Sequence, residues 1–74
     1  MSDPILVPRA VLDGIEAVRQ SGATNMLDRP RVAQLCDALG FYEAALWVHD
    51  NRDLYARGIF HGFRVAPAEG APGA

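Results

Sequence analysis

A single cysteine in a chain of 74 residues is the feature that most restricts this fold. Cys36 has no partner for an internal disulfide, and one thiol nearly excludes a cysteine-rich zinc site. Residues 65–74 read VAPAEGAPGA, so we expect a flexible tail there and a single domain over residues 1–64. A domain of about 60 residues buries only about 60% of the surface that its unfolded chain exposes. Its stability is therefore marginal, and we expect a homodimer that buries a second apolar surface.

The charges are few and mixed. The chain carries seven arginines, no lysine and nine acidic residues, for a formal net charge of −2. This composition lacks the clustered positive charge that a nucleic-acid backbone attracts. The N-terminus has an acidic residue where a signal peptide needs basic ones, and its longest apolar run, Ile5 to Val7, is too short to span a bilayer. We therefore expect a cytoplasmic protein that does not contact a membrane.

Two helices are predicted in the first half of the chain. After Pro8, which suits the first helical position, apolar residues recur every three or four positions. Asp28 is a good N-cap for a second helix, and Gly40 ends that helix. We expect Cys36 to be a small core residue of the second helix. The two apolar stripes are Val7, Val11, Ile15 and Val18, and Val32, Leu35, Cys36 and Leu39.

The second half predicts one or two further helices. A stripe from Phe41 to Phe63 could belong to one long helix, but Arg52 would then be buried without a partner. The run Asp50 to Asp53 is more typical of one helix that ends and an N-cap that starts another. We therefore predict an all-α fold, a compact small domain of three or four helices with an extended N-terminal lead-in and no sheet. The alternative is a small strand pair formed by Ile5 to Val7 and Phe60 to Val65.

The two central helices, with Gly40 between them, resemble a helix-turn-helix motif, although this match has low specificity. In that motif the second helix would present Tyr42, Glu43, Ala44, Trp47 and Val48 to the DNA major groove. None of them is an arginine, lysine, asparagine or glutamine that could read base edges. DNA binding or a role in DNA packaging is therefore an alternative function, and nucleic acid is not the expected partner.

The start of the second helix departs from the usual charge pattern. Arg29 and Arg31 lie where the helix dipole disfavours cations, and with Thr24 and Asn25 they could bind a phosphate or a carboxylate. Such a site would suit a protein that sequesters a phosphorylated nucleotide signal. The simpler interpretation, which we favour, is that Asp28 neutralises this helix end and both arginines are exposed.

No catalytic or metal-binding set is recognisable, and no cofactor is expected. His49 and Asp53 stand four residues apart, but two ligands do not make a metal site and no third residue has suitable spacing. We interpret them as part of a solvated polar face. No nucleophile, base and orienting group occur in a known local pattern, so we do not expect an enzyme.

The aromatic residues give the best functional indication. A domain this small cannot bury all of them, and exposed aromatic residues often mark protein-binding surfaces. Together with nearby leucines and a glycine, the aromatic residues lie on two flanks of the third helix and its continuation: Trp47, Leu54 and Gly58 on one side, and Tyr42, Leu46 and Phe60 on the other. We predict protein binding through Tyr42, Trp47, Leu54, Gly58 and Phe60, with a homodimer formed through the Trp47 flank.

Two short motifs resemble a known family. Residues 24–28 read T-N-M-L-D and residues 40–43 read G-F-Y-E. Together with Asn51, Arg52, Tyr55 and Ile59, they are similar to a small uncharacterised family of bacteriophage and prophage proteins, in which a T-N-M-x-D loop precedes a helix and a G-F-Y-E turn follows it. The resemblance covers about residues 11–62. It implies a phage-encoded accessory protein in a bacterial cytoplasm and transfers no catalytic residue.

These observations predict a non-enzymatic helical module that binds a protein of the host or of the phage, for example as an inhibitor of a host system. The alternatives are a DNA-binding or DNA-packaging accessory with a helix-turn-helix-like core, and a protein that sequesters a phosphorylated nucleotide.

Overall fold

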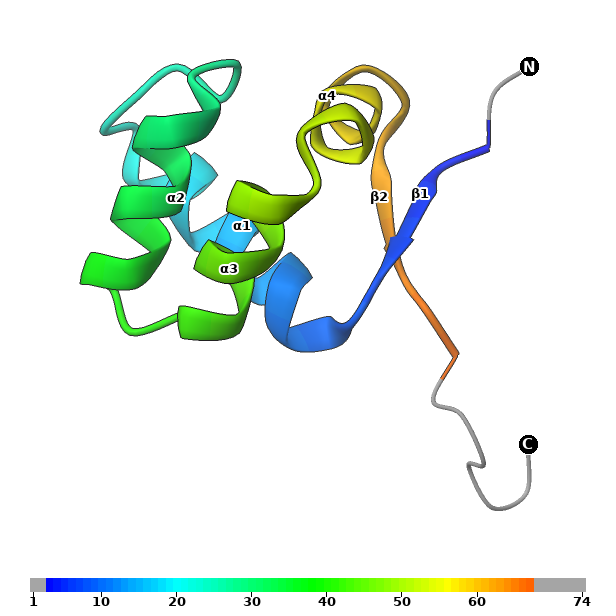
Figure 1. Cartoon of the computed structure of the whole chain (residues 1–74), viewed down its shortest axis with the longest axis horizontal. Coiled ribbons are helices and arrows are strands. Elements are labelled where there is room, and N and C mark those ends of the chain that lie inside the picture. The colour runs from blue at the N-terminus through cyan, green and yellow to red at the C-terminus, as the bar shows by residue number, and fades with distance from the viewer. Residues whose placement is uncertain (1–2, 68–74) are drawn as a thin grey trace.

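The structure is a computed structural model that describes residues 3–67. This part of the chain forms β1 (Ile5–Val7), α1 (Arg9–Ser21), α2 (Arg29–Ala38), α3 (Tyr42–Asp50), α4 (Arg52–His61) and β2 (Phe63–Val65). The four helices gather into one body, and the two strands lie side by side at one end of it (Figure 1). The predicted compact fold of three or four helices is therefore confirmed, with four helices in the described residues.

The predicted caps define α2 and the turn that follows it. The Asp28 carboxylate accepts a hydrogen bond of 3.4 Å from a backbone N–H in the first turn of the helix. At the other end Gly40 has a φ of +90°, a conformation that favours glycine. The Gly40 N–H donates to the Asp37 carbonyl at 3.0 Å, and the Phe41 N–H donates to the Cys36 carbonyl at 2.8 Å. This Schellman pattern satisfies the last carbonyls of α2, so the chain can turn at once into α3.

The core lies between the helices and β1. Both predicted stripes contribute to it, and Cys36, with 0% of its surface exposed, is confirmed as a core residue. Leu39 departs from its stripe and is 51% exposed, because α2 ends there. α1 and α3 approach closely at Gly14, where an added Cβ would collide with Ala44. The fully buried apolar residues are Val7, Val11, Ile15, Val18, Val32, Cys36, Ala44, Val48 and Tyr55.

α3 and α4 are separate helices, as the position of Arg52 predicts. Asn51 lies between them and directs two donors to one acceptor. Its backbone N–H and its side-chain amide both donate to the Trp47 carbonyl, at 2.9 and 3.0 Å. The backbone bond is an ordinary i→i−4 bond of α3. Asn51 itself leaves the helical conformation, with a φ of −118° and a ψ of 60°, and Arg52 then lies exposed in the first turn of α4 rather than buried in a long helix.

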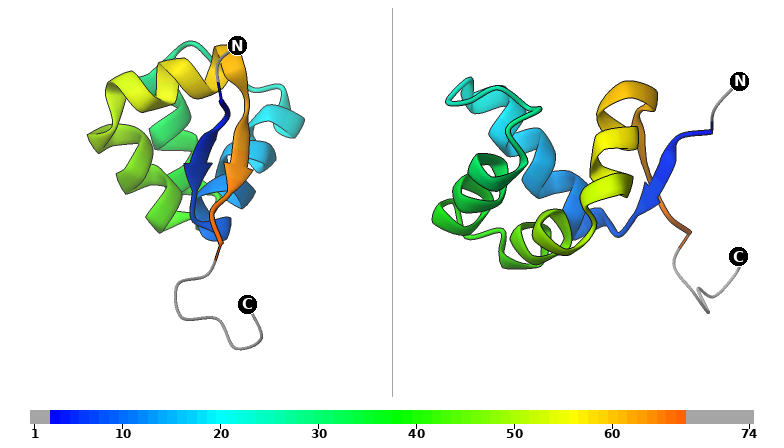
Figure 2. Two further views of the ribbon diagram at one scale, coloured as in Figure 1. Left: turned by 90° about the vertical axis from the view of Figure 1, so that its right-hand side faces the viewer. Right: turned by 45° about the horizontal axis from the view of Figure 1, so that its top comes forward.

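The expectation that no sheet accompanies the helices is wrong. β1 and β2 pair in parallel, with Ile5 opposite Phe63. α4 ends at His61 and is followed by its C-cap Gly62, whose φ is +96°; the chain then runs beside β1 (Figure 2). The alternative strand pair is therefore present, although β2 begins at Phe63 rather than at Phe60. Strands of three residues are too short to show the period-two pattern from which strands are predicted.

The predicted boundary of the tail also needs correction. Val65 belongs to β2, and the Ala66 N–H donates to the Val7 carbonyl at 2.8 Å. Both residues fall in the range that the sequence predicts as a tail, but they are part of the folded domain. Residues 68–74, the rest of the predicted tail, lie outside the described residues.

Candidate docking groove

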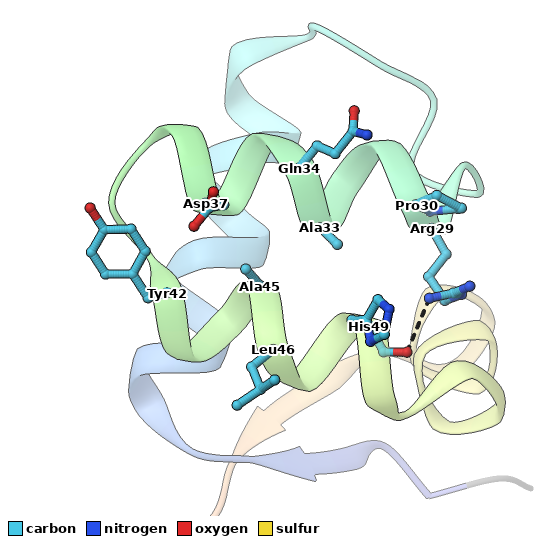
Figure 3. Close-up of a pocket in the computed structure, with 9 residues that line it drawn as sticks. All are labelled: Arg29, Pro30, Ala33, Gln34, Asp37, Tyr42, Ala45, Leu46 and His49. Carbon is cyan, nitrogen blue, oxygen red and sulfur yellow. Dashed lines mark hydrogen bonds between the residues drawn. The ribbon is translucent and has the colours of Figure 1, made fainter.

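α2 and α3 form an antiparallel pair. The Gly40 turn joins the end of α2 to the start of α3, and Arg29 links their other ends. One guanidinium nitrogen of Arg29 lies 3.1 Å from the His49 carbonyl oxygen and 3.5 Å from that of Val48. The two helices therefore lie side by side in opposite directions, as Figure 3 shows.

A groove runs between the outer sides of these two helices. The small, half-buried Ala33 and Ala45 form its floor, and both side chains lie between α2 and α3 in Figure 3. The groove is open along its length, so it suits a segment of polypeptide better than a small molecule that must be enclosed. Its lining consists of Arg29, Pro30, Ala33, Gln34, Asp37, Tyr42, Ala45, Leu46 and His49.

Tyr42 and Leu46 give the groove its exposed apolar surface. They lie one turn apart on α3, with 69% and 64% of their surfaces exposed. Charged and polar side chains occupy the two ends: Arg29 and His49 at one, Asp37 at the other. Apolar side chains with polar ones around them are the usual composition of a protein-binding surface.

The Trp47 flank, by contrast, is partly covered by β2 of the same chain. Trp47 is half-buried, and its ring meets the Phe63 ring edge-on, with the centroids 6.0 Å apart and the planes at 79°. Gly58 is buried, and an added Cβ there would collide with the same Phe63 ring. β2 of the same chain therefore occupies the space beside Gly58, where the sequence predicts the approach of a second copy.

The remaining residues predicted to bind proteins lie on α4. Leu54 and Phe60 are 39% and 71% exposed, and neither lines the groove. The break at Asn51 separates residues that a continuous helix would have aligned. Of the five predicted protein-binding residues, Tyr42 belongs to the groove. The other apolar lining residues are Pro30, Ala33, Ala45 and Leu46, and they come together only because α2 and α3 pair.

The groups of the predicted anion site mostly have local partners instead. Arg29 donates to the carbonyls at the end of α3, and Arg31 donates to the Gln34 side-chain oxygen at 3.2 Å. The Asn25 side-chain oxygen accepts the Leu27 N–H at 2.8 Å, and Thr24 is half-buried. The Asp28 cap that the simpler interpretation requires is present. Only Arg29, through its position at the groove, enters the candidate site.

The loop before α2 is held in place by Tyr55. Its hydroxyl donates to the Met26 carbonyl at 2.5 Å, and Met26 packs against the core. Burial raises the pKa of Tyr55 to about 12, with a further increase from Cys36 and a decrease from Arg19. Burial also raises the pKa of the Cys36 thiol, which favours its protonated form. The loop that carries T-N-M-L-D is therefore a structural connection fixed to the core.

The geometry also bears on the DNA-binding and metal-binding alternatives. Of the positions expected to face DNA, Ala44 and Val48 are buried, and Trp47 packs on Phe63. The His49 ring nitrogen Nδ1 lies 3.0 Å from an Asp50 carboxylate oxygen. Among residues 3–67, no three histidine, cysteine, aspartate or glutamate side chains are grouped so that they could hold a metal ion. None of the helices in this range has the length and apolar character needed to cross a membrane.

The four helices lie within the range of residues that a known family model matches. Residues 9–63 match the family model described as a domain of unknown function, DUF5049. The match runs from the start of α1 to the first residue of β2 and so includes every helix described above. No curated protein and no solved structure shows significant similarity to the chain. The chain therefore belongs to the DUF5049 family.

Proposed function

We propose that the protein is a non-enzymatic interaction module whose α2/α3 groove receives an amphipathic helix of another protein. The observation that carries this proposal is the exposure of Tyr42 and Leu46 beside a floor of alanines. Adjacent exposed apolar side chains in a small domain commonly mark a binding surface. The resemblance to phage proteins supports a phage-type accessory role in a bacterial cytoplasm, with a host or phage protein as the partner and inhibition of a host system as its effect.

The shape of the groove favours a helix as the occupant. Ala33 and Ala45 add little bulk between α2 and α3, so the axis of a third helix can come close to both. From Arg29 to Asp37 the groove follows about 12 Å of α2, or about two helical turns. This length accommodates apolar side chains spaced at i, i+3 or i+4, and i+7 on the bound helix.

The charges at the ends of the groove give the bound helix a direction. A helix carries partial negative charge at its C-terminus and partial positive charge at its N-terminus. Arg29 therefore attracts the C-terminal end of the bound helix, and Asp37 attracts its N-terminal end. The bound helix should run antiparallel to α2.

A photoreactive benzoylphenylalanine in place of Leu46 tests the groove in cells. The matched control carries the same group in place of Phe60, which is as exposed as Leu46 but lies on α4. We expect a covalent adduct with one defined protein from position 46 and none from position 60. Equal yields of the same adduct from both positions would contradict docking in the groove.

Binding of the captured protein, once purified, completes the test. Ala45→Glu places a charge on the groove floor and should weaken binding by about tenfold or more, the effect of losing a central contact. Phe60→Ala should bind like the wild type. Circular dichroism establishes that both variants are folded. Unchanged binding by a folded Ala45→Glu variant would exclude the groove as the docking site.

A further inference from the structure

The sheet of β1 and β2 is unusual because it is parallel and has only two strands. Parallel sheets are normally covered on both faces, and two strands alone are marginally stable. Here Leu6 and Arg64 lie opposite each other in the register, and both are exposed. Figure 2 shows the two strands side by side in front of the helices, with one face of the sheet toward the viewer. The sheet therefore has an open face and two outer edges, one on each strand.

The hydrogen-bond register shows which backbone groups lie at the edges. Ile5 is opposite Phe63, and its N–H donates to the Gly62 carbonyl at 2.9 Å. In a parallel ladder, alternate residues direct their backbone groups toward the neighbouring strand. The N–H and C=O groups of Phe63 and Val65 therefore point to the outer edge of β2. Within residues 3–67, neither residue forms a backbone hydrogen bond outside the β1–β2 pairing.

The two edges of the sheet differ in the backbone N–H groups that they can donate to a further strand. On β1, the outward-facing positions are Pro4, Leu6 and Pro8, and a proline has no N–H to donate. Prolines on an outer strand are a common protection against pairing with another chain. The outer edge of β2 has two free donors, at Phe63 and Val65. It is therefore the edge that can accept a strand.

We propose that the outer edge of β2 binds an extended segment of another protein that carries an acidic residue opposite Arg64. In an antiparallel pairing that uses both Phe63 and Val65, the Cα of Arg64 would lie about 4.5 Å from that of the facing residue. A carboxylate at that position pairs with the guanidinium. The bound strand would continue the exposed face of the sheet, on which Arg64 lies.

A second copy of β2 is a poorer occupant of this edge. In the antiparallel register that satisfies Phe63 and Val65 of both copies, Arg64 would stand directly opposite Arg64 of the other copy. Like charges in directly opposite positions destabilise a strand pair. Shifting the register by one position on each strand would place Pro67 or the helical His61 in the pairing, with loss of hydrogen bonds. The charge on Arg64 thus favours a foreign, acidic strand.

A cyclised β-hairpin peptide with the outer strand Thr-Val-Glu-Val-Thr is the probe. The control peptide has lysine in place of the central glutamate. In NMR titrations of the isotope-labelled protein, the Glu peptide should shift the Phe63 and Val65 amide signals and slow their hydrogen exchange. It should bind about fivefold or more tightly than the Lys peptide, as expected for an opposite rather than a like charge pair.

Two variants sharpen the test. Arg64→Glu changes only an exposed side chain and should reverse the preference between the two peptides. Val65→Pro removes one outward donor and should abolish binding, whereas Leu6→Pro, the equivalent change on β1, should not. Equal binding of the two peptides, no response at Phe63 and Val65, or self-association that Val65→Pro abolishes would each overturn the proposal. This edge shares no residue with the α2/α3 groove, so an experiment can disprove either binding proposal without affecting the other.

Discussion

Trp47 and Tyr42 are both aromatic residues of α3 outside its fully buried positions, yet they have different environments. Trp47 is half-buried against Phe63, whereas Tyr42 is 69% exposed beside the groove. The difference arises from β2, which follows α4 and brings Phe63 to one side of α3. On the other side, Tyr42 and Leu46 stay exposed beside the groove that α2 and α3 form. Which aromatic residue is exposed thus depends on the path of the chain after α3 more than on its position along that helix.

The Trp47 side should therefore contribute to folding, and the Tyr42 side should be available for binding. Phe63 touches both Trp47 and the buried Gly58, so the contacts of β2 stabilise the domain itself. Tyr42 and Leu46 can change without leaving a cavity. Matched substitutions on the two sides test this division.

The largest difference in the free energy of unfolding is expected between alanine substitutions at two phenylalanines. Phe63→Ala removes a ring packed against Trp47, Tyr55 and Gly58 and should lower the free energy of unfolding by about 3 kcal/mol. Phe60→Ala changes an exposed residue and should lower it by less than about 0.5 kcal/mol. Urea denaturation followed by circular dichroism measures both values. Equal losses would show that β2 does not close this side of α3.

The adjacent pair Trp47 and Leu46 gives the next largest difference. Trp47→Ala should cost about 2 kcal/mol, less than a fully buried tryptophan because part of the ring is exposed. Leu46→Ala should cost less than about 0.5 kcal/mol. Because the Trp47 contacts lie within one chain, the stability that Trp47→Ala loses should not depend on protein concentration. A concentration-dependent loss, with a wild-type dimer in sedimentation, would instead support the homodimer that the sequence predicts.

The two tyrosines should differ by less. Tyr55→Phe removes the hydroxyl that donates to the Met26 carbonyl and should lower the free energy of unfolding by about 1 kcal/mol. Tyr42→Phe removes a hydroxyl from a side chain that is mostly exposed and should have no measurable effect. Denaturation at neutral pH compares the two variants. A similar cost for both would mean that the Met26 contact does not stabilise the loop.

Alkaline pH tests the same residue in another way. Because burial raises the pKa of Tyr55 to about 12, the folded state favours the neutral phenol. Its contribution to stability is present below a pH of about 10, the ordinary pKa of tyrosine, and is lost as the pH rises toward the folded-state pKa. The wild type should therefore lose more stability than Tyr55→Phe over this window. Urea denaturation of both proteins at a series of pH values measures this difference. If Tyr55 is not responsible, the two proteins would lose the same amount of stability as the pH rises.

The helices could be predicted because their signals are local. The spacing of Val11, Ile15 and Val18 defines one buried stripe, and Asp28 and Gly40 mark the ends of α2. The position of Arg52 predicts the break between α3 and α4 for a local reason as well, the cost of burying its charge. Each of these signals acts within a few residues along the chain.

The surfaces could not be predicted, because they depend on contacts between distant residues. Gly58 suggested a close approach, and the structure has one, but the group that approaches is Phe63 rather than another copy. Ala33 and Ala45 are ordinary helical residues until α2 and α3 pair and make them the floor of a groove. From the sequence the strand pair is only an alternative, because the pairing of Ile5 with Phe63 joins the two ends of the domain.

The smallest expected effect concerns the two arginines at the start of α2, which the sequence did not distinguish. Arg29 donates to the carbonyls that end α3 and so closes one end of the groove, whereas Arg31 reaches the exposed Gln34. Since the Arg29 contact is partly exposed, Arg29→Met should cost about 0.5 kcal/mol, and Arg31→Met should cost less. In a domain of this size, a loss of that magnitude lowers the melting temperature by about 2–4 °C. Phosphate should raise the melting temperature of neither the wild type nor either variant. Stabilisation of the wild type by phosphate that Arg29→Met abolishes would instead show that this end of α2 binds anions and that Arg29 leaves α3 to do so.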